Sequence, residues 1–242
     1  MAGIPDMFLG AGDVAVWFQR VGEEAAARAP AYLELLSRSE RESHDRRRPS
    51  TRLEFLTAHA LLRRALSRHV AVEPSAWRFE VDEHGRPHLV DPPRDVQIDF
   101  NLSHTEGLVA CAVTGSGQVG IDVECLDEQR DVARIAPRIL APTEQRWLEG
   151  LEAADRGLGM LDCWTLKEAH LKALGTGLRS PIKDLAFDVG PGKSTRILTG
   201  PMGSHTPADW HYLRSAPTPC HRLAAAIGSV EEPRWHLAEF PA

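Results

Sequence analysis

The chain has 242 residues, of which 43% are hydrophobic, and its formal net charge at pH 7 is −6. This length and composition can supply a buried core, as one large domain or two small ones, and they argue against a disordered chain. The acidic balance argues against general binding to nucleic acid or to an anionic membrane, because both require a surplus of basic residues.

The cysteines and the amino terminus indicate a cellular compartment. The four cysteines form no CxxC pair and no dense framework, which is typical of reduced, mostly buried thiols. The amino terminus has no basic stretch followed by an apolar core, and no apolar run approaches the roughly 20 residues of a membrane span. We therefore expect a cytoplasmic protein without a membrane segment.

The spacing of apolar residues and the positions of turn residues predict helices and strands along the whole chain. Helices are predicted over residues 30–38, 52–69 and 160–174, and residues 131–152 are predicted to be helical in parts, with interruptions at Pro137 and Pro142. Strands are predicted over residues 13–20, 77–81, 98–102, 108–114, 119–125, 184–189, 194–199, 209–215 and 221–228. Residues 115–120 match GxGxxG, but a strand follows them where a dinucleotide site requires a helix, so we interpret the glycines as a hairpin turn.

The second half of the chain resembles the first. A shift of 108 residues lays Phe55-Leu56-Thr57 on Cys163-Trp164-Thr165, and it lays Phe79-x-Val81 on Phe187-x-Val189. This repeat predicts an α/β (α+β) fold of two pseudo-symmetric halves, residues 1–114 and 115–242, each a small, mostly antiparallel sheet packed on a long helix. The default position for a ligand in such a protein is the cleft between the halves.

Two short segments carry acidic residues in a pattern that suggests a metal site. On the strand over residues 119–125, Asp122 and Glu124 project from one face, and such a pair is stable when a hard cation such as Mg²⁺ lies between the carboxylates. On the helix over residues 160–174, Glu168 and Lys172 share a face at i and i+4. Solvent-facing acids on an amphipathic strand, and an ordinary exposed ion pair on the helix, explain these residues equally well at this point.

Residues 38–52 carry many arginines and one histidine, His44. A solvated helix face with internal salt bridges would explain this composition. A phosphate-binding patch would also explain it, because the planar guanidinium of Arg suits phosphate.

Four motifs together resemble one known family. They are Gly85-Arg86-Pro87, Phe100-Asn101-Leu102-Ser103-His104, Gly120-Ile121-Asp122-Val123-Glu124 and Trp164-Thr165-Leu166-Lys167-Glu168-Ala169-x-x-Lys172. Their order and approximate spacing are similar to those of the 4'-phosphopantetheinyl transferase family, of the kind that activates surfactin-type peptide synthetases. The last two motifs are the specific ones, and the resemblance spans about residues 38 to 178.

The resemblance implies roles for individual residues. Asp122, Glu124 and Glu168 would bind Mg²⁺, which bridges them to the pyrophosphate of coenzyme A. The residues that would bind coenzyme A are Arg41, His44, Arg86, Pro87, Ser103, His104, Lys167 and Lys172. Arg86 replaces the lysine usual in the family's Gly-Lys-Pro turn, which keeps the charge and changes the donor geometry. Residue 59 is histidine where many relatives have arginine, and we assign it no role.

The implied reaction transfers the 4'-phosphopantetheine of coenzyme A to a serine of an apo acyl or peptidyl carrier protein and releases 3',5'-ADP. Glu168 is the first candidate for the base, with Lys172 beside it, and Glu144 or a water held by either glutamate is the second. Residues 126–147 are the candidate docking segment for the carrier, because they combine Arg130, Arg134 and Arg138 with Ile135, Ile139 and Leu140. We expect a monomer, since one chain carries both halves.

Two other functions are compatible with the sequence. The same acids could serve a Mg²⁺-dependent coenzyme A or nucleotide pyrophosphatase with water as the nucleophile, and consumption of coenzyme A without a carrier would identify it. A non-catalytic carrier-docking module is the third hypothesis, and the intact acidic residues argue against it. The sequence does not indicate which carrier proteins are served or whether acyl-coenzyme A is accepted.

Overall fold

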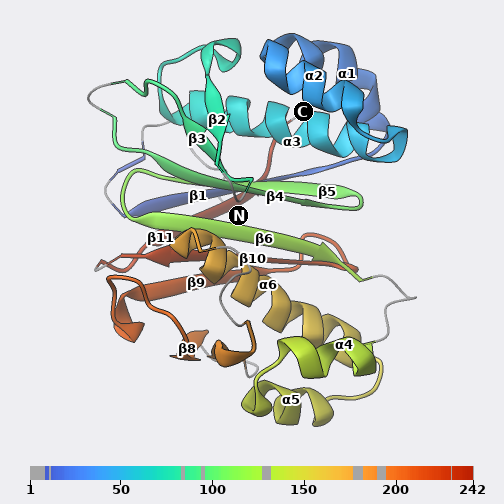
Figure 1. Cartoon of the computed structure of the whole chain (residues 1–242), viewed down its shortest axis with the longest axis vertical. Coiled ribbons are helices and arrows are strands. Elements are labelled where there is room, and N and C mark those ends of the chain that lie inside the picture. Colours follow the sequence, from blue (N-terminus) through green and yellow to red (C-terminus); the bar gives the residue numbers. More distant parts are fainter. Residues whose placement is uncertain are drawn as a thin grey trace. The chain divides into compact units, whose positions relative to one another are not determined.

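The structure is a computed structural model of the whole chain, and it describes residues 9–10, 12–82, 85–93, 96–126, 132–176, 182–189, 195–229 and 231–241. The chain forms two compact units (Figure 1). The first contains Met1–Ser116 and Arg234–Ala242, and the second contains Gly117–Pro233. The expected boundary after residue 114 lies close to the observed one, but the carboxyl-terminal segment belongs to the first unit and not to the second.

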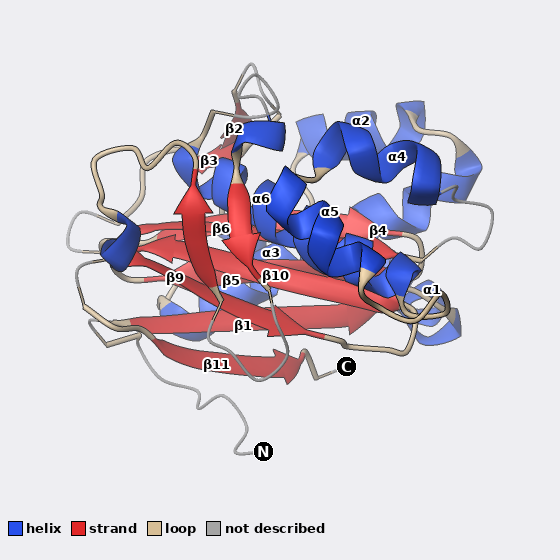
Figure 2. Cartoon of the chain, turned by 90° about the horizontal axis from the view of Figure 1, so that it is seen from below, coloured by secondary structure: helices blue, strands red, loops and turns tan. Residues whose placement is uncertain are grey.

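The first unit is a sheet covered by helices on one face. Its elements are β1 (Asp13–Arg20), α1 (Glu23–Leu35), α2 (Arg38–Arg46), α3 (Pro49–His69), a short 3-10 turn η1 (Pro74–Ala76), β2 (Phe79–Val81), β3 (Pro87–Leu89), β4 (Asp99–Thr105), β5 (Leu108–Thr114) and β11 (Arg234–Glu239). The strand order of the main sheet is β11-β1-β5-β4, in which β11 runs parallel to β1 and the other neighbours are antiparallel. Figure 2 shows β11 beside β1 at the edge of this sheet. Strands β2 and β3 form a separate hairpin.

Helix α3 is buried on almost every side because it lies between the sheet and two other helices. Leu61, Leu62 and Leu66 belong to the core that α3 shares with the sheet. On the other side, Phe55 and Leu56 pack with residues of α1 and of the segment that follows it. Helix α2 begins with a capping box, in which Ser37 accepts from the backbone of residue 40 and the residue 40 carboxylate accepts from the Ser37 backbone.

The second unit repeats this plan. Its elements are β6 (Gln118–Cys125), α4 (Val132–Ile139), α5 (Pro142–Glu149), α6 (Arg156–Leu174), η3 (Ile182–Asp184), β7 (Ala186–Asp188), β8 (Arg196–Thr199), η4 (Pro207–Asp209), β9 (Trp210–Ser215) and β10 (His221–Gly228). The main sheet has the order β6-β10-β9 with antiparallel neighbours, and β7 and β8 form a hairpin.

The order of elements confirms the duplicated α/β fold. In the first unit a strand, a long helix, a hairpin and two more strands follow one another as β1, α3, β2–β3, β4 and β5. In the second unit the equivalents are β6, α6, β7–β8, β9 and β10. In both sheets the last strand of the series pairs with the first and with its own predecessor.

Several predicted boundaries were wrong. The helix predicted over residues 30–38 is two helices, because α1 begins at Glu23 and ends at Leu35, and α2 begins at Arg38. Helix α4 continues through Pro137, where we predicted an interruption, whereas Pro142 begins α5 as expected for the first turn. Strand β11 was not predicted. Within the described residues, the helices include none with the length and hydropathy of a membrane span.

Gly120 allows α6 to approach β6 closely. A Cβ atom at this position would lie 2.0 Å from the carbonyl oxygen of Ala169 and 2.4 Å from the backbone nitrogen of Ala173. Both neighbours are helix backbone, which cannot move aside as a flexible side chain can. The glycine that begins the acidic motif therefore determines the distance between this strand and this helix.

We expect Gly120→Ala to lower the free energy of unfolding by at least about 1–3 kcal/mol, because the added methyl group pushes α6 away from β6. Urea denaturation followed by circular dichroism measures this loss. Gly115→Ala is the matched control, since its added methyl group would meet the nearest atom at an ordinary 3.5 Å. Equal stabilities of the two variants would contradict the close packing of α6 on β6.

His170 of α6 is a neutral histidine inside the second unit. Its Nε2 donates to the carbonyl of Pro201 at 2.7 Å, and its Nδ1 lies 2.9 Å from the hydroxyl of Tyr212. Burial lowers the pKa of His170 to about 4 from 6.5, although the bond to Pro201 opposes the shift. The unfolded chain therefore takes up this proton at a higher pH than the folded chain does.

The contribution of His170 to stability is complete above pH 6.5 and is lost as the pH falls towards 4. We expect the free energy of unfolding to be about 2 kcal/mol smaller at pH 5 than at pH 7.5 from this group alone. Urea denaturation at the two pH values tests this, with His170→Gln as the comparison. If the variant lost as much stability as the unaltered protein over this range, His170 would not be the responsible group.

Candidate functional site

The acidic motif lies on β6, where α6 packs against it. Asp122 is only 5% exposed, so the interpretation of a solvent-facing acid is wrong for this residue. Lys172 of α6 donates from Nζ to Oδ1 of Asp122 at 2.7 Å. Glu124, two residues further along β6, is half-buried.

Glu168 completes this group, which we call the acidic trio of Asp122, Glu124 and Glu168. Burial raises the pKa of Glu168 to about 7, and the charges of Asp122 and Glu124 raise it too, whereas Lys172 lowers it. The charges of both other carboxylates therefore act on Glu168, although the oxygens of the three residues do not all lie within 4.8 Å of one another. Their hard oxygen donors fit Mg²⁺.

Lys167, also on α6, bonds to residues outside the acidic trio. Its side chain is fully buried, and its Nζ donates to the carbonyls of Ile139 at 2.8 Å and Ile182 at 3.1 Å. The same ammonium pairs with Oε2 of Glu144 at 2.7 Å. The structure therefore gives Lys167 a place in the core and not the predicted contact with pyrophosphate.

Glu144 is likewise enclosed, with a fully buried side chain. Its carboxylate accepts from the backbone nitrogens of Ala141 at 2.8 Å and Phe187 at 3.0 Å, in addition to Lys167. Burial raises the pKa of Glu144 and lowers that of Lys167, and the attraction between the two charges opposes both shifts. A carboxylate with these partners joins α5 to α6 and to β7, so the structure does not support its predicted role as a base.

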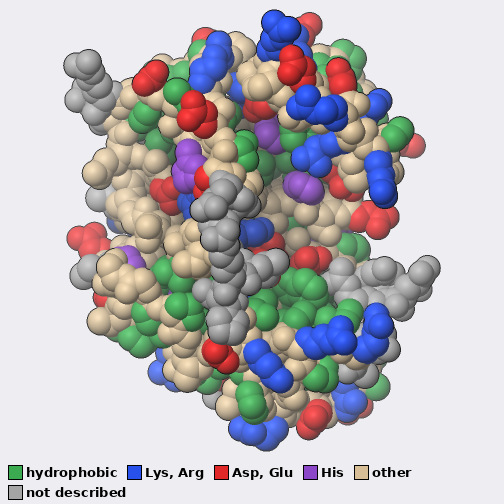
Figure 3. All heavy atoms as spheres, in the orientation of Figure 1, with side chains coloured by type: hydrophobic (Ala, Val, Ile, Leu, Met, Phe, Trp, Pro, Cys, Tyr) green, Lys and Arg blue, Asp and Glu red, His purple; other side chains and the backbone are tan. Residues whose placement is uncertain are grey.

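The first unit contains a cavity of about 590 Å³, which we call the α2–α3 cavity. The residues that line it belong to α2, α3, the β2–β3 hairpin and β4. Pro87 and His104, two residues predicted to bind coenzyme A, are among them, together with Gly85 of the same turn. Figure 3 shows basic side chains gathered over the part of the first unit where Figure 1 places α1 and α2.

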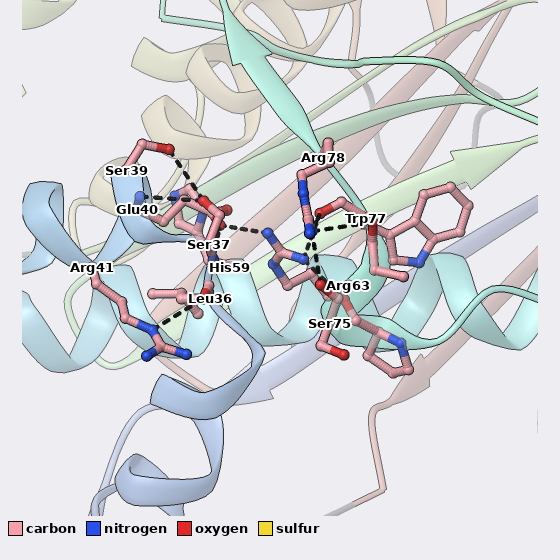
Figure 4. A network of polar contacts seen from close by, with 12 residues as sticks. Leu36, Ser37, Ser39, Glu40, Arg41, His59, Arg63, Ser75, Trp77 and Arg78 are labelled. Carbon is pink, nitrogen blue, oxygen red and sulfur yellow. Dashed lines mark hydrogen bonds and ion pairs between the residues drawn. The ribbon is translucent and has the colours of Figure 1, made fainter.

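One wall of this cavity is a buried polar network (Figure 4). Glu40 of α2 accepts from Nδ1 of His59 at 2.9 Å and pairs with the guanidinium of Arg63. Burial alone would raise the pKa of Glu40, but the hydrogen bonds from His59 and Ser37 and the charge of Arg63 lower it to about 2. Glu40 is therefore ionised at neutral pH and fixes α2 to α3.

Arg47 and His59 line the cavity, although the sequence analysis assigned neither of them a role in binding coenzyme A. Arg47 lies over the ring of Phe55 at 4.3 Å, and His59 lies 4.0 Å from the same ring, centroid to centroid. Both line the α2–α3 cavity. The arginine-rich composition of residues 38–52 was the signal for Arg47, but composition could not show which of these arginines faces the cavity.

Arg41 and His44 are engaged in the fold of the first unit. Arg41 donates to the carbonyls of Leu36 at 3.0 Å and Glu34 at 3.2 Å, which closes the end of α1. Nδ1 of His44 lies 2.9 Å from Oδ1 of Asp45. Neither Arg41 nor His44 is among the residues that line the cavity.

Arg86 and Ser103 are also held by their neighbours. Arg86 donates from one nitrogen to both carboxylate oxygens of Asp99 and to the carbonyl of Phe100, each at 3.1 Å, so it attaches the turn to β4. Ser103 is buried on β4, whereas the next residue, His104, is exposed. Of this motif, Leu102 and His104 line the cavity.

The predicted docking segment contributes to a second cavity, of about 430 Å³, within the second unit. Ala136 and Pro137 of α4 and Leu148 of α5 are among the residues that line it. Arg134 and Arg138 are exposed, and Arg130 lies outside the described residues. Ile139 and Leu140 are buried in the core, so they do not supply the apolar docking surface that we expected of them.

Comparisons with known proteins identify the family of this chain. The model of a family described as the 4'-phosphopantetheinyl transferase superfamily matches residues 118–227, which lie within the second unit and contain the acidic trio. The 4'-phosphopantetheinyl transferase HetI of Nostoc sp. is 30% identical over 190 residues, which are 78% of this chain and 77% of HetI. The 4'-phosphopantetheinyl transferase Sfp of Bacillus subtilis is 29% identical over 153 residues, which are 63% of this chain and 64% of Sfp.

Solved structures were compared in the same way. A holo-(acyl-carrier-protein) synthase from Bacillus anthracis, solved in complex with CoA (3',5'-ADP), is 20% identical with a TM-score of 0.41, and the match covers 47% of this chain and 96% of that one. The match to HetI extends over more than three quarters of both chains. By its sequence, this chain belongs to the 4'-phosphopantetheinyl transferase superfamily.

Proposed function

We propose that this protein transfers the 4'-phosphopantetheine moiety of coenzyme A to a serine of an apo acyl or peptidyl carrier protein and releases 3',5'-ADP. Membership of the family supports the reaction. The observation that carries the proposal is the group formed by the acidic trio and Lys172, which offers oxygen donors and one ammonium for a pyrophosphate with its metal.

Asp122, Glu124 and Glu168 would hold Mg²⁺, which fits their oxygen donors. When bound, the ion would neutralise charge on the pyrophosphate and make the leaving group better. Lys172 already lies 2.7 Å from Asp122, so its ammonium is placed to bind a pyrophosphate oxygen beside the same carboxylate.

The reaction forms a bond from the serine oxygen of the carrier to the β-phosphorus and breaks the bond from that phosphorus to the bridging oxygen. The bridging oxygen leaves with 3',5'-ADP. The serine proton needs an acceptor, and two glutamates were predicted for this role. Glu144 is enclosed in the core, whereas Glu168 belongs to the acidic trio, so we assign the role to Glu168. Glu168 would take the proton on a carboxylate oxygen, directly or through a water.

The α2–α3 cavity would hold the nucleotide end of coenzyme A. Its volume lies in the usual range for small-molecule sites. Arg47, His59 and His104 line it and carry donors suited to a phosphate, so we assign the 3'-phosphate to this cavity.

Arg47→Gln should raise the KM for coenzyme A by about 10-fold to 100-fold, because a hydrogen bond to a charged group contributes about 1.5–3 kcal/mol. The KM for 3'-dephospho-coenzyme A should change little, since it lacks the phosphate. Steady-state kinetics with both substrates tests this. Arg46→Gln is the matched control, because Arg46 is exposed on α2 and is not among the lining residues. Equal effects of Arg47→Gln on the two substrates would contradict the assignment.

The reaction itself is tested by mass spectrometry. Purified protein with coenzyme A and Mg²⁺ should add the mass of phosphopantetheine to an apo carrier protein, and a chelator should prevent it. Failure on apo carriers from fatty-acid, polyketide and peptide synthesis would refute the proposal. Consumption of coenzyme A without any carrier would instead identify the pyrophosphatase.

We also propose that the protein acts as a monomer in the cytoplasm. Both the acidic trio and the α2–α3 cavity are built from residues of one chain, and the four cysteines are thiols and not disulfides. Light scattering coupled to size-exclusion chromatography tests the oligomeric state.

A further inference from the structure

Two cysteines and a histidine meet at one end of the second unit's sheet. Cys125 is the last residue of β6, and its cross-strand partner on β10 is His221. Cys220 immediately precedes β10. Among the described residues, these three form the group of His, Cys, Asp and Glu side chains whose ligand atoms all lie within 4.8 Å of one another. We call it the Cys–His cluster.

The distances within the cluster suit tetrahedral coordination. The two sulfurs are 3.5 Å apart, and Sγ of Cys220 is 3.4 Å from Nδ1 of His221. With a Zn–S bond of about 2.3 Å and a Zn–N bond of about 2.0–2.1 Å, tetrahedral angles give edges of about 3.8 Å for S···S and about 3.6 Å for S···N. At these two edges a metal ion would need side-chain shifts of a few tenths of an ångström, and the third pair, Cys125 and His221, lies within 4.8 Å.

The surroundings keep the donors oriented. Thr218 lies with its hydroxyl 2.6 Å from Nδ1 of His221 and 3.4 Å from Sγ of Cys220. A hydroxyl that donates to Nδ1 selects the tautomer with its proton on Nε2, and a metal ion would take over the Nδ1 lone pair that this hydrogen bond occupies. The imidazole is buried, whereas Cys220 is exposed, so that an ion can enter from solvent.

We propose that the Cys–His cluster binds one Zn²⁺ ion through Cys125, Cys220 and His221, with water as the fourth ligand. Thiolate and imidazole donors select zinc over the hard cation Mg²⁺, so this site is chemically distinct from the acidic trio, although Cys125 directly follows Glu124. Binding converts two thiols to zinc-bound thiolates and releases their two protons to solvent.

Bound zinc would cross-link the end of β6 to the start of β10. The ladder ends there, with the Leu126 nitrogen bonded to the Cys220 carbonyl at 2.8 Å as the next contact. Because zinc binds the folded arrangement, it should stabilise the second unit in proportion to its affinity.

The test uses the whole protein, reduced, stripped of metal with a chelator and then titrated with Zn²⁺ against a chromogenic chelator. We expect one equivalent of zinc per chain, a higher thermal unfolding temperature, and a thiolate-to-metal charge-transfer band when Co²⁺ replaces zinc. Loss of a partner that only orients a metal ligand weakens binding by about 10-fold to 100-fold, so Cys220→Ser, which removes a ligand, should weaken it by at least about 100-fold.

Cys111→Ala is the control, because this thiol is buried in β5 of the first unit and should leave zinc binding unchanged. Absence of zinc binding at micromolar concentrations, or binding that Cys220→Ser does not weaken, would overturn the proposal. So would a reduced protein that binds no zinc and loses two thiols as a Cys125–Cys220 disulfide in air. None of these measurements depends on the transferase reaction.

Discussion

Asp122→Ala should abolish transfer of phosphopantetheine while leaving the second unit folded. Asp122 pairs with Lys172 at 2.7 Å, and its charge raises the pKa of Glu168. Removal of Asp122 therefore disturbs two other members of the site at once. Loss of one positioned electrostatic group costs about 10²–10³-fold in rate, and here a metal ligand is lost as well. The rate of mass gain on an apo carrier protein at saturating coenzyme A measures the effect.

Asp162→Ala is the matched control for this variant. Asp162 also lies on an element of the second unit and also pairs with a cation, Arg222, at 3.3 Å, but it is not part of the acidic trio. It should retain the transfer rate. Circular dichroism of both variants checks that the sheet is intact, and an Asp122→Ala protein with an unchanged, Mg²⁺-dependent rate would contradict the metal assignment.

The acidic trio could be predicted because its members occur in two short, regular segments. The alternation of β6 and the i, i+4 spacing of α6 define which side chains share a face, and the resemblance of the motifs connects the two segments. The depth of Asp122 could not be predicted, because it depends on the contact of α6 with β6. That contact in turn depends on Gly120, whose missing Cβ leaves room for Ala169 and Ala173.

Strand β11 illustrates what the pattern of the sequence cannot show. Residues 234–239 are short and mixed in polarity, and their neighbour in the sheet is β1, at the other end of the chain. A segment whose stability comes from so distant a partner gives little local signal. The duplication was visible because its two long helices, α3 and α6, carry similar residues at similar positions.

The α2–α3 cavity was predicted in part. The resemblance assigned coenzyme A binding to Arg86 as well as to His104, whereas the structure engages Arg86 with Asp99. Arg47 and His59 come from the end of α2 and the middle of α3, and they meet because Glu40 and Arg63 join these helices. Tertiary packing decides which side chains face the cavity, and a sequence motif does not show it.

Lys167 shows the same limit most clearly, because its role in the core follows from packing and not from its motif. Lys167→Met should lower the free energy of unfolding by about 3–5 kcal/mol, because it leaves the Glu144 carboxyl in the core without its counter-charge. The carbonyls of Ile139 and Ile182 also lose a donor. Urea denaturation measures the loss, and Glu144→Gln in the same chain should restore part of it by removing the unpaired charge.

Lys172→Met is the comparison that separates the two lysines of the motif. Lys172 also pairs with a carboxylate at 2.7 Å, but its side chain is 29% exposed, so the lost ion pair should cost little stability. Its transfer rate should fall, because the ammonium proposed to bind the pyrophosphate is gone. A Lys167→Met protein that is stable but inactive would reverse this distinction and return Lys167 to the phosphate-binding role that the motif alone suggests.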